Sequence, residues 1–106
     1  EEKIKIISSI SKPDFGNVPS DFSISQNYPN PFNPSTYIEY TLPEASNVKL
    51  VIYDILGKEV AVLVDEHQGK GKYRINFNAT NLSSGVYLYR FSTSKFAQTK
   101  KMVLAK

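Results

Sequence analysis

The residue types most often used in catalysis are scarce in this 106-residue chain. His67 is the only histidine, it directly follows Asp65 and Glu66, and cysteine and tryptophan are absent. A hydrolytic triad requires a serine on a sharp turn, a base beside it and an acid that orients the base. No Gly-x-Ser-x-Gly sequence supplies that turn, and neighbours in sequence do not by themselves converge on one substrate atom. We therefore expect no catalytic residues and no enzymatic activity.

The chain also lacks a recognisable pattern for a metal or a cofactor. Without cysteine and with one histidine, a Cys/His zinc cage is excluded. Asp14, Asp21, Asp54 and Asp65 are candidate calcium ligands, but no D-x-[DN]-x-[DN]-G loop brings them together. The Gly-Lys-Gly-Lys stretch at 69–72 lacks the spacing of a phosphate-binding loop and precedes a strand rather than a helix. We expect no metal and no cofactor.

Charge is divided unevenly along the chain. Residues 1–66 carry five lysines and all ten acids, whereas residues 67–106 carry six lysines, two arginines and no acid. Such a basic half indicates either an anionic partner or well-solvated strand faces. We do not expect nucleic-acid binding, because it uses exposed aromatics between cations and the tyrosines of 86–93 alternate as a core face does. No apolar run approaches the ~20 residues of a membrane span, so no membrane insertion is expected.

Apolar and polar residues alternate with a period of two, which predicts β-strands. The expected strands are 22–25, 36–42, 48–53, 58–65, 73–77, 86–93 and 96–104. Seven short strands without a helical period favour an all-β fold, a seven-stranded antiparallel Ig-like β-sandwich. An up-and-down barrel is the alternative. The side chains expected to face inward are Ile38, Tyr40, Leu42, Val48, Leu50, Ile52, Tyr73, Ile75, Phe77, Tyr87, Tyr89, Phe91, Met102 and Leu104.

The connections carry their own signals. Glycine-containing hairpin loops are expected at 54–57 and at 67–71. The three prolines of 27–35 predict a stiff, extended loop that crosses the fold, with the rings of Tyr28 and Phe32 as inward anchors. Tyr87 follows a polar connection, so its hydroxyl is a candidate to bond back to that connection as a tyrosine corner. Residues 1–21 are interpreted as a linker or tail, and 22–106 as the folded domain.

Four sequence segments, each weak alone, are specific for one protein family when they occur together and in this order. They are NYPNPFNPST (27–36), YTLPEASNVKLVIYDILGKEV (40–60), GKGKYRINFNATNLSSGVYLYRF (69–91) and KFAQTKKMVLAK (95–106). Through them the chain resembles the type A C-terminal sorting domain of the Bacteroidetes type IX secretion system, over about residues 22–106. That family is similar to the Ig-like domain of flagellar hook-capping proteins, which agrees with the sandwich interpretation.

The resemblance implies a C-terminal sorting and export signal for a larger secreted protein. Such domains pass through the periplasm in transit and direct their cargo through an outer-membrane translocon to the surface or the medium. The implied partners are a periplasmic or outer-membrane receptor and, in many members, a sortase-like protease that removes the domain and anchors the cargo. Cleavage would then fall within residues 1–21. The recognition residues implied by the resemblance are Gly85, Tyr87, Tyr89, Arg90, Lys95, Lys100, Lys101, Met102, Val103, Leu104 and Lys106.

The final strand is expected to combine an apolar face, anchored by Met102 and Leu104, with a Lys-rich opposite face that meets the machinery. Lysines on an edge strand normally discourage strand addition, but they admit a partner that matches both the backbone ladder and the charge. An open edge also allows an edge-strand dimer. The alternative function is a non-catalytic Ig-like spacer or a carbohydrate-binding adhesion module that uses exposed Tyr37 and Tyr53.

Overall fold

A computed structural model of the protein describes residues 20–106. Its strands are β1 Ser23–Ile24, β2 Ser35–Leu42, β3 Ser46–Asp54, β4 Glu59–Gln68, β5 Gly71–Asn78, β6 Gly85–Ser92 and β7 Ala97–Leu104. No helix occurs in this part of the chain. The predicted linker falls almost entirely on residues 1–19, which lie outside the described residues.

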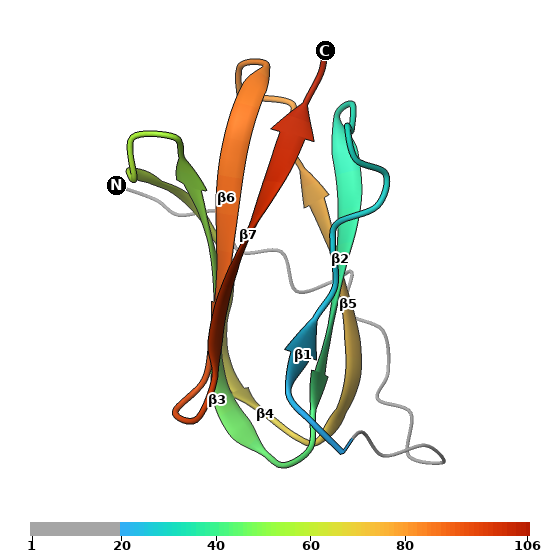
Figure 1. Ribbon diagram of the computed structural model, residues 1–106, viewed down its shortest axis with the longest axis vertical. Coiled ribbons are helices and arrows are strands. Elements are labelled where there is room, and N and C mark those ends of the chain that lie inside the picture. The colour runs from blue at the N-terminus through green and yellow to red at the C-terminus, as the bar shows by residue number, and fades with distance from the viewer. Residues whose placement is uncertain (1–19) are drawn as a thin grey trace.

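The strands form two antiparallel sheets that face each other as two layers (Figure 1). One sheet has the order β1-β2-β5 and the other the order β4-β3-β6-β7. Two separate facing sheets confirm the predicted seven-stranded β-sandwich and show that the barrel alternative is wrong. Strand β7 is an edge strand of the second sheet, and β1 is an edge strand of the first.

The core lies between the sheets and is built from the inward positions of the alternating strands. All of the strand side chains expected to face inward are buried, including Ile38, Leu50, Phe77 and Phe91. Side chains that face the opposite sheet are removed from water on folding. Burial of each large apolar side chain stabilises the fold by about 1.5–3 kcal/mol relative to an exposed position. The face assignments made from period-two alternation are therefore confirmed.

Strand β4 carries a bulge that explains its run of apolar residues. Leu50 pairs with Val64 and Val51 pairs with Val62, so Leu63 is an extra residue on the β4 side. Leu63 is 0% exposed and belongs to the core. The bulge lets β4 bury consecutive residues, which a regular strand with one solvated face does not do.

The hairpin loop expected at 54–57 joins β3 to β4 and is held by its own backbone. One carboxylate oxygen of Asp54 accepts hydrogen bonds from the backbone N–H groups of Leu56 and Lys58, both at 2.9 Å. Gly57 has a φ of 87°, the left-handed conformation that favours glycine. The prediction of a hairpin at this position is confirmed.

The prediction of a second hairpin loop at 67–71 is wrong. Strand β4 continues through Gln68, and β5 begins at Gly71 in the other sheet, so the connection crosses between the layers. Gln68 is buried and its side-chain oxygen accepts a hydrogen bond from the hydroxyl of Tyr40 on the facing sheet. Glycine signals a turn in either case, and it does not say whether the next strand stays in the same sheet.

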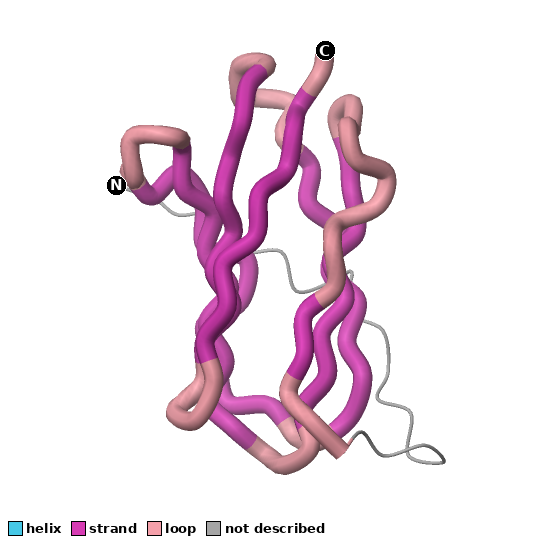
Figure 2. Tube along the Cα trace, viewed as in Figure 1, coloured by secondary structure: helices cyan, strands magenta, loops and turns pink. Residues whose placement is uncertain are grey.

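The proline-rich segment between β1 and β2 leaves and re-enters the first sheet, and on its way it reaches the edge of β7 in the second sheet (the loop between β1 and β2 in Figure 2). It bridges Tyr28 to Tyr37 on β2 and Phe32 to Leu104 on β7. The bonds preceding Pro29, Pro31 and Pro34 are cis. Phe32 is 1% exposed and anchors the segment in the core, but Tyr28 is 77% exposed, so its prediction as an inward anchor is wrong. The antiparallel bridge to Tyr37 places Tyr28 over the solvent side of the first sheet.

Candidate recognition site on the terminal strands

The residues implied as the recognition site lie on β6, on β7 and in the segments beside them. The two strands pair along their whole length, from Gly85 opposite Leu104 to Ser92 opposite Ala97. Because residues directly opposite one another in an antiparallel pair share a face of the sheet, this register sorts the residues into an inner and an outer set.

The inner set contains Tyr87, Tyr89, Met102 and Leu104, which are all buried. Tyr87 lies opposite Met102, and both side chains belong to the core cluster. A partner protein does not reach these side chains while the domain is folded. Their contribution to recognition is therefore indirect, because they fix the position of β7 against the rest of the sandwich.

Tyr89 ties the terminal strands to the segment that follows β1. Its hydroxyl donates a hydrogen bond to the carbonyl of Ser25 at 2.7 Å and accepts one from the backbone N–H of Asn27 at 2.9 Å. Burial raises the pKa of Tyr89 to about 12, against a smaller lowering by the hydrogen bond from Asn27. The phenol is therefore neutral at physiological pH and serves as both a donor and an acceptor.

Tyr87 and Gly85 shape the start of β6. The hydroxyl of Tyr87 donates a hydrogen bond to the carbonyl of Ser83 at 2.7 Å, which confirms the predicted bond back to the preceding connection. Gly85 has a φ of 156°, which L side chains rarely adopt. Tyr87 therefore ties β6 to the preceding connection, and Gly85 permits the backbone conformation with which β6 begins.

The outer set contains Arg90, Lys101 and Val103. Arg90 lies opposite Thr99, Lys101 opposite Leu88, and Val103 opposite Val86, on the face of the sheet that points away from the core. Arg90 and Lys101 are exposed and Val103 is half-buried. These are the side chains of the implied site that a partner can contact directly.

Lys100 does not share the face of Lys101, because consecutive residues of a strand point to opposite sides. It lies opposite Tyr89, in the row that includes Met102, and is half-buried at the rim of the sandwich. The expectation of one Lys-rich face opposite an apolar one is therefore wrong: the two lysines flank the edge of β7 from both sides.

The two outermost lysines of the implied site are engaged within the domain. The ammonium group of Lys95 lies 2.8 Å from a carboxylate oxygen of Glu44. The ammonium group of Lys106 donates a hydrogen bond to the carbonyl of Thr80 at 2.6 Å. Both contacts are exposed, so a partner can compete for these cations at small energetic cost.

One half of the β7 edge is covered by the proline-rich segment. The backbone N–H of Phe32 donates to the carbonyl of Val103 at 2.9 Å, and the carbonyl of Phe32 accepts from the N–H of Ala105 at 3.0 Å. The side chain of Asn30 accepts from the N–H of Val103 at 3.0 Å, and that of Gln26 donates to the carbonyl of Lys101 at 2.7 Å. The C-terminal half of β7 is thus paired with β6 on one side and with the proline-rich segment on the other.

The other half of the β7 edge has no such cover from the described residues. Alternate residues of an antiparallel strand direct their backbone groups to the same side. Since Lys101 and Val103 point their groups outward, Thr99 and Ala97 do so as well. Among residues 20–106, no hydrogen bond engages the outward N–H of Lys101 or the backbone groups of Thr99. A short edge centred on Thr99 is open to another strand.

Sequence reasoning identified β7 but missed the residues that cover half of it. Gln26 and Asn30 act through single side-chain amides that reach a strand more than 70 positions later in the sequence. No periodicity or spacing signals such contacts. The only available sign was the density of asparagine and proline in 27–34, which indicated a fixed loop without its partner.

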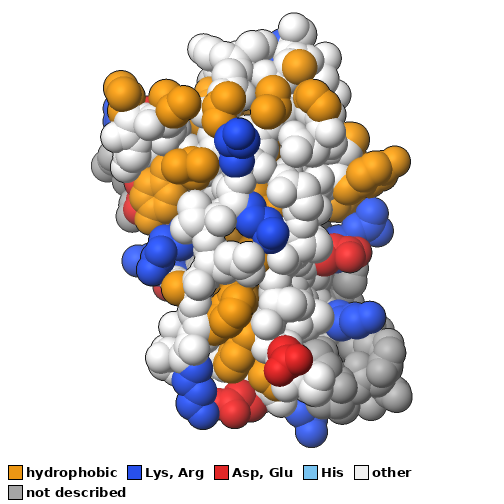
Figure 3. Space-filling model, viewed as in Figure 1, with side chains coloured by type: hydrophobic (Ala, Val, Ile, Leu, Met, Phe, Trp, Pro, Cys, Tyr) orange, Lys and Arg blue, Asp and Glu red, His pale blue; other side chains and the backbone are white. Residues whose placement is uncertain are grey.

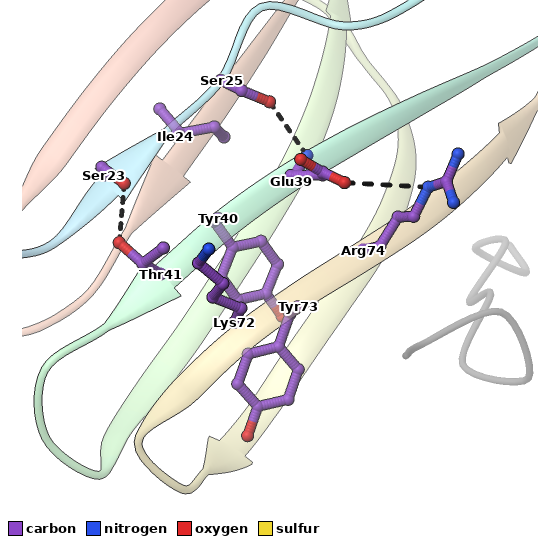
Figure 4. Close-up of a pocket in the computed structure, with 9 residues that line it drawn as sticks. All are labelled: Ser23, Ile24, Ser25, Glu39, Tyr40, Thr41, Lys72, Tyr73 and Arg74. Carbon is purple, nitrogen blue, oxygen red and sulfur yellow. Dashed lines mark hydrogen bonds and ion pairs between the residues drawn. The ribbon is translucent and has the colours of Figure 1, made fainter. Parts of the chain in front are cut away.

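The outer face of the first sheet contains a shallow hollow (Figure 4). Its volume is about 430 Å³, and its polar groups largely satisfy one another. The hydroxyls of Ser23 and Thr41 lie 2.6 Å apart, and Arg74 lies 3.8 Å from the carboxylate of Glu39. The residues that line this hollow do not bring a nucleophile, a base and an oxyanion donor together.

The two tyrosines considered for carbohydrate binding do not form one platform. Tyr37 lies on β2 of the first sheet, with the guanidinium of Arg74 3.9 Å from the centre of its ring. Tyr53 lies on β3 of the second sheet. One sugar therefore cannot stack on both rings.

Ionisable groups elsewhere do not converge either. Nδ1 of His67 lies 3.0 Å from the side-chain oxygen of Asn47 in an exposed position. Within residues 20–106, no three or more histidine, aspartate or glutamate side chains gather where a metal could bind. In the same part of the chain, no helix has the length and apolar character needed to cross a bilayer.

The chain is similar to a known protein family. The family model described as the secretion system C-terminal sorting domain matches residues 26–105. No curated protein and no solved structure matches the chain. The matched region includes every strand from β2 to β7 and the whole proline-rich segment.

Proposed function

The chain belongs to the family of secretion system C-terminal sorting domains, and we propose that its signal is read from the outward surface of β7. As a member it carries a sorting signal for type IX secretion, which implies export across the outer membrane to the cell surface or the medium. The finer proposal concerns which atoms are read. The partner is a receptor of the secretion machinery, met in the periplasm or at the outer membrane.

The observation that carries this proposal is the half-open edge of β7. The proline-rich segment pairs with Val103 and Ala105, while the backbone groups around Thr99 remain directed outward. An extended receptor segment can add to this edge and gain main-chain hydrogen bonds. Natural proteins usually block such edges, so an edge blocked at one end and left open at the other supports a binding role.

Charge supplies the selectivity in this proposal. Lys100 and Lys101 flank the open edge from opposite faces. Among residues 20–106, no ion pair engages either of them. A receptor strand with carboxylates on both faces matches the ladder and the charge together, which raises the association rate and disfavours uncharged competitors. Attraction of this kind weakens as salt is added.

We further propose that the cargo precedes this domain and that any cleavage by a sortase-like protease falls within residues 1–21. The folded domain supports this assignment because its paired strands offer no extended segment for a protease between Ser35 and Leu104 apart from short connections. Surface anchoring of the cargo would follow that cleavage.

The test uses a reporter with a periplasmic signal peptide, fused in front of the chain and expressed in a host with type IX secretion. Met102 and Leu104 are buried, so removing the last strand would unfold the domain and confuse folding with recognition. Charge reversal avoids this problem. The variant Lys100→Glu/Lys101→Glu should retain its melting temperature within a few degrees and leave most of the reporter in the periplasm.

The matched control is Lys70→Glu/Lys72→Glu, which changes the same charge at exposed positions away from β7. This control should be exported as the unaltered fusion is. Unchanged surface delivery of the Lys100→Glu/Lys101→Glu fusion would contradict the proposed role of β7.

A further inference from the structure

The outer face of the second sheet is apolar at one end, where a solvated face would be polar. Tyr53 on β3, Val86 and Leu88 on β6, and Val103 on β7 are all half-buried there. In the hairpin that follows β3, Ile55 is 68% exposed and Leu56 is 90% exposed. Large exposed apolar side chains of this kind mark contact surfaces when they are contiguous. We call these six residues the outer patch.

The strand register makes the outer patch contiguous. Tyr53 lies opposite Leu88, and Val86 lies opposite Val103, so the four side chains occupy neighbouring positions on one face. The β3–β4 hairpin begins directly after Tyr53. Adjacent strands lie ~4.8 Å apart, so the patch extends over three strands, or about 10 Å, from the hairpin to β7.

The space-filling view agrees with this arrangement (Figure 3). Hydrophobic side chains gather on the upper left of the molecule, over the β3–β4 hairpin and the upper part of β6 and β7. Lysine and arginine side chains lie beside them along β7. The apolar area therefore adjoins the basic edge rather than standing alone.

The hairpin presents its aliphatic side chains in a fixed position. Asp54 holds the backbone of Leu56 and Lys58 through two hydrogen bonds, and Gly57 supplies the left-handed residue of the turn. A preformed turn loses little conformational entropy when its side chains become buried in a partner. Ile55 and Leu56 thus have the character of binding anchors.

We propose that the outer patch is a second docking surface, which inserts Ile55 and Leu56 into an apolar pocket of a protein receptor with carboxylates on its rim. Arg90 and Lys101 border the patch, and residues 67–106 contain no acid to neutralise them. A receptor that holds the β7 edge is within reach of the patch, because on β7 itself Val103 belongs to the patch and Lys101 borders it. The proposal rests on the proposed sorting function and deepens it.

The charges favour such a receptor over a second copy of this chain. Asp54 is committed to the hairpin backbone, and Glu59, opposite Tyr53, is also engaged. A second copy would present the same committed acids to Arg90 and Lys101. A lipid surface is disfavoured because the border of the patch includes the acids Asp54 and Glu59 as well as Arg90 and Lys101, whereas membrane-binding surfaces surround their apolar residues with cations alone.

The test places a photocrosslinking phenylalanine derivative at position 56 or 88 of the full fusion, in cells that are exporting it. Position 28, also exposed but on the other sheet, is the control. A covalent adduct with an outer-membrane or periplasmic component of the type IX machinery, at 56 and 88 but not at 28, is expected. Adducts between two copies of this chain, adducts with lipid alone, or no adduct would overturn the proposal.

A second measurement uses substitutions that remove two apolar side chains of the outer patch, one of them an anchor. Leu56→Asn/Leu88→Thr should leave the melting temperature nearly unchanged, because Leu56 is exposed and threonine suits a strand. Loss of the anchor Leu56 and of the patch residue Leu88 lowers affinity by about tenfold or more, so surface delivery should fall by a similar factor at low expression. The control variant Tyr28→Ser should be exported normally. Normal export of Leu56→Asn/Leu88→Thr would contradict the outer patch.

The two proposals fail in different ways. If Lys100→Glu/Lys101→Glu blocks export and Leu56→Asn/Leu88→Thr does not, the outer patch is refuted and the proposed sorting role of β7 stands. If the unaltered fusion is exported equally well in a host that lacks the type IX translocon, the sorting function itself is refuted.

Discussion

Replacing Tyr89 by phenylalanine tests whether the terminal strands are locked to the segment after β1 by one hydroxyl. The ring of Tyr89 is 0% exposed and would keep its packing as phenylalanine. The change removes the hydrogen bonds to Ser25 and from Asn27 and leaves their backbone groups without that partner. Such a loss inside a protein costs about 1–3 kcal/mol of unfolding free energy.

For a domain of this size, each kcal/mol shifts the melting temperature by about 4–8 °C. Tyr89→Phe should therefore lower it by about 4–24 °C, measured by circular dichroism or tyrosine fluorescence. Tyr28→Phe is the control, because the ring of Tyr28 is 77% exposed and water replaces any lost contact. A melting temperature of Tyr89→Phe within 1 or 2 °C of the unaltered protein would show that this hydroxyl does not lock the terminal strands in place.

The same hydroxyl predicts an alkaline limit to stability. Tyr89 has its pKa raised from 10.0 to about 12 in the folded state, because burial disfavours the phenolate. The unfolded chain therefore releases its proton first as the pH rises. The stabilisation is fully present below pH 10 and is lost between pH 10 and about 12. The unfolding free energy of Tyr89→Phe should fall less steeply over this range than that of the unaltered protein.

Three further predictions concern the terminal strand and its surroundings. Leu104→Ala should lower the unfolding free energy by about 2–4 kcal/mol in urea titrations, because a buried leucine leaves a cavity. Asn30→Ala should lower the unfolding free energy by no more than about 1.5 kcal/mol. It should speed hydrogen exchange of the Val103 amide, because the variant removes the acceptor of that N–H. Unchanged exchange would contradict the covering of the β7 edge by Asn30. Lys95→Ala should change stability by less than about 1 kcal/mol, since its ion pair with Glu44 is exposed.

Local alternation was sufficient to predict most of this fold. A residue such as Ile75 or Phe91, flanked by polar neighbours, has only one face on which it can be buried, so strand and orientation follow together. The tyrosine corner at Tyr87 was also predictable, because its partner lies four residues away. Both inferences depend on contacts that are short in sequence.

Features that depend on distant contacts were not predictable in this way. The crossover after Gln68 is accompanied by a hydrogen bond between Gln68 and Tyr40 on the other sheet, a distant contact that the local glycines do not encode. The split β7 edge depends on Gln26 and Asn30, which reach it across most of the sequence. The outer patch was missed because Leu56 sits in a turn, where alternation does not apply.

The most direct test of the account is whether residues 20–106 alone can route an unrelated passenger. A fluorescent reporter with a periplasmic signal peptide is joined to this segment, and its fraction accessible to externally added protease is measured on intact cells. The account predicts an accessible fraction well above background in a host with the type IX translocon, and background in an isogenic host without it. Equal accessibility in both hosts, or retention inside both, would contradict it.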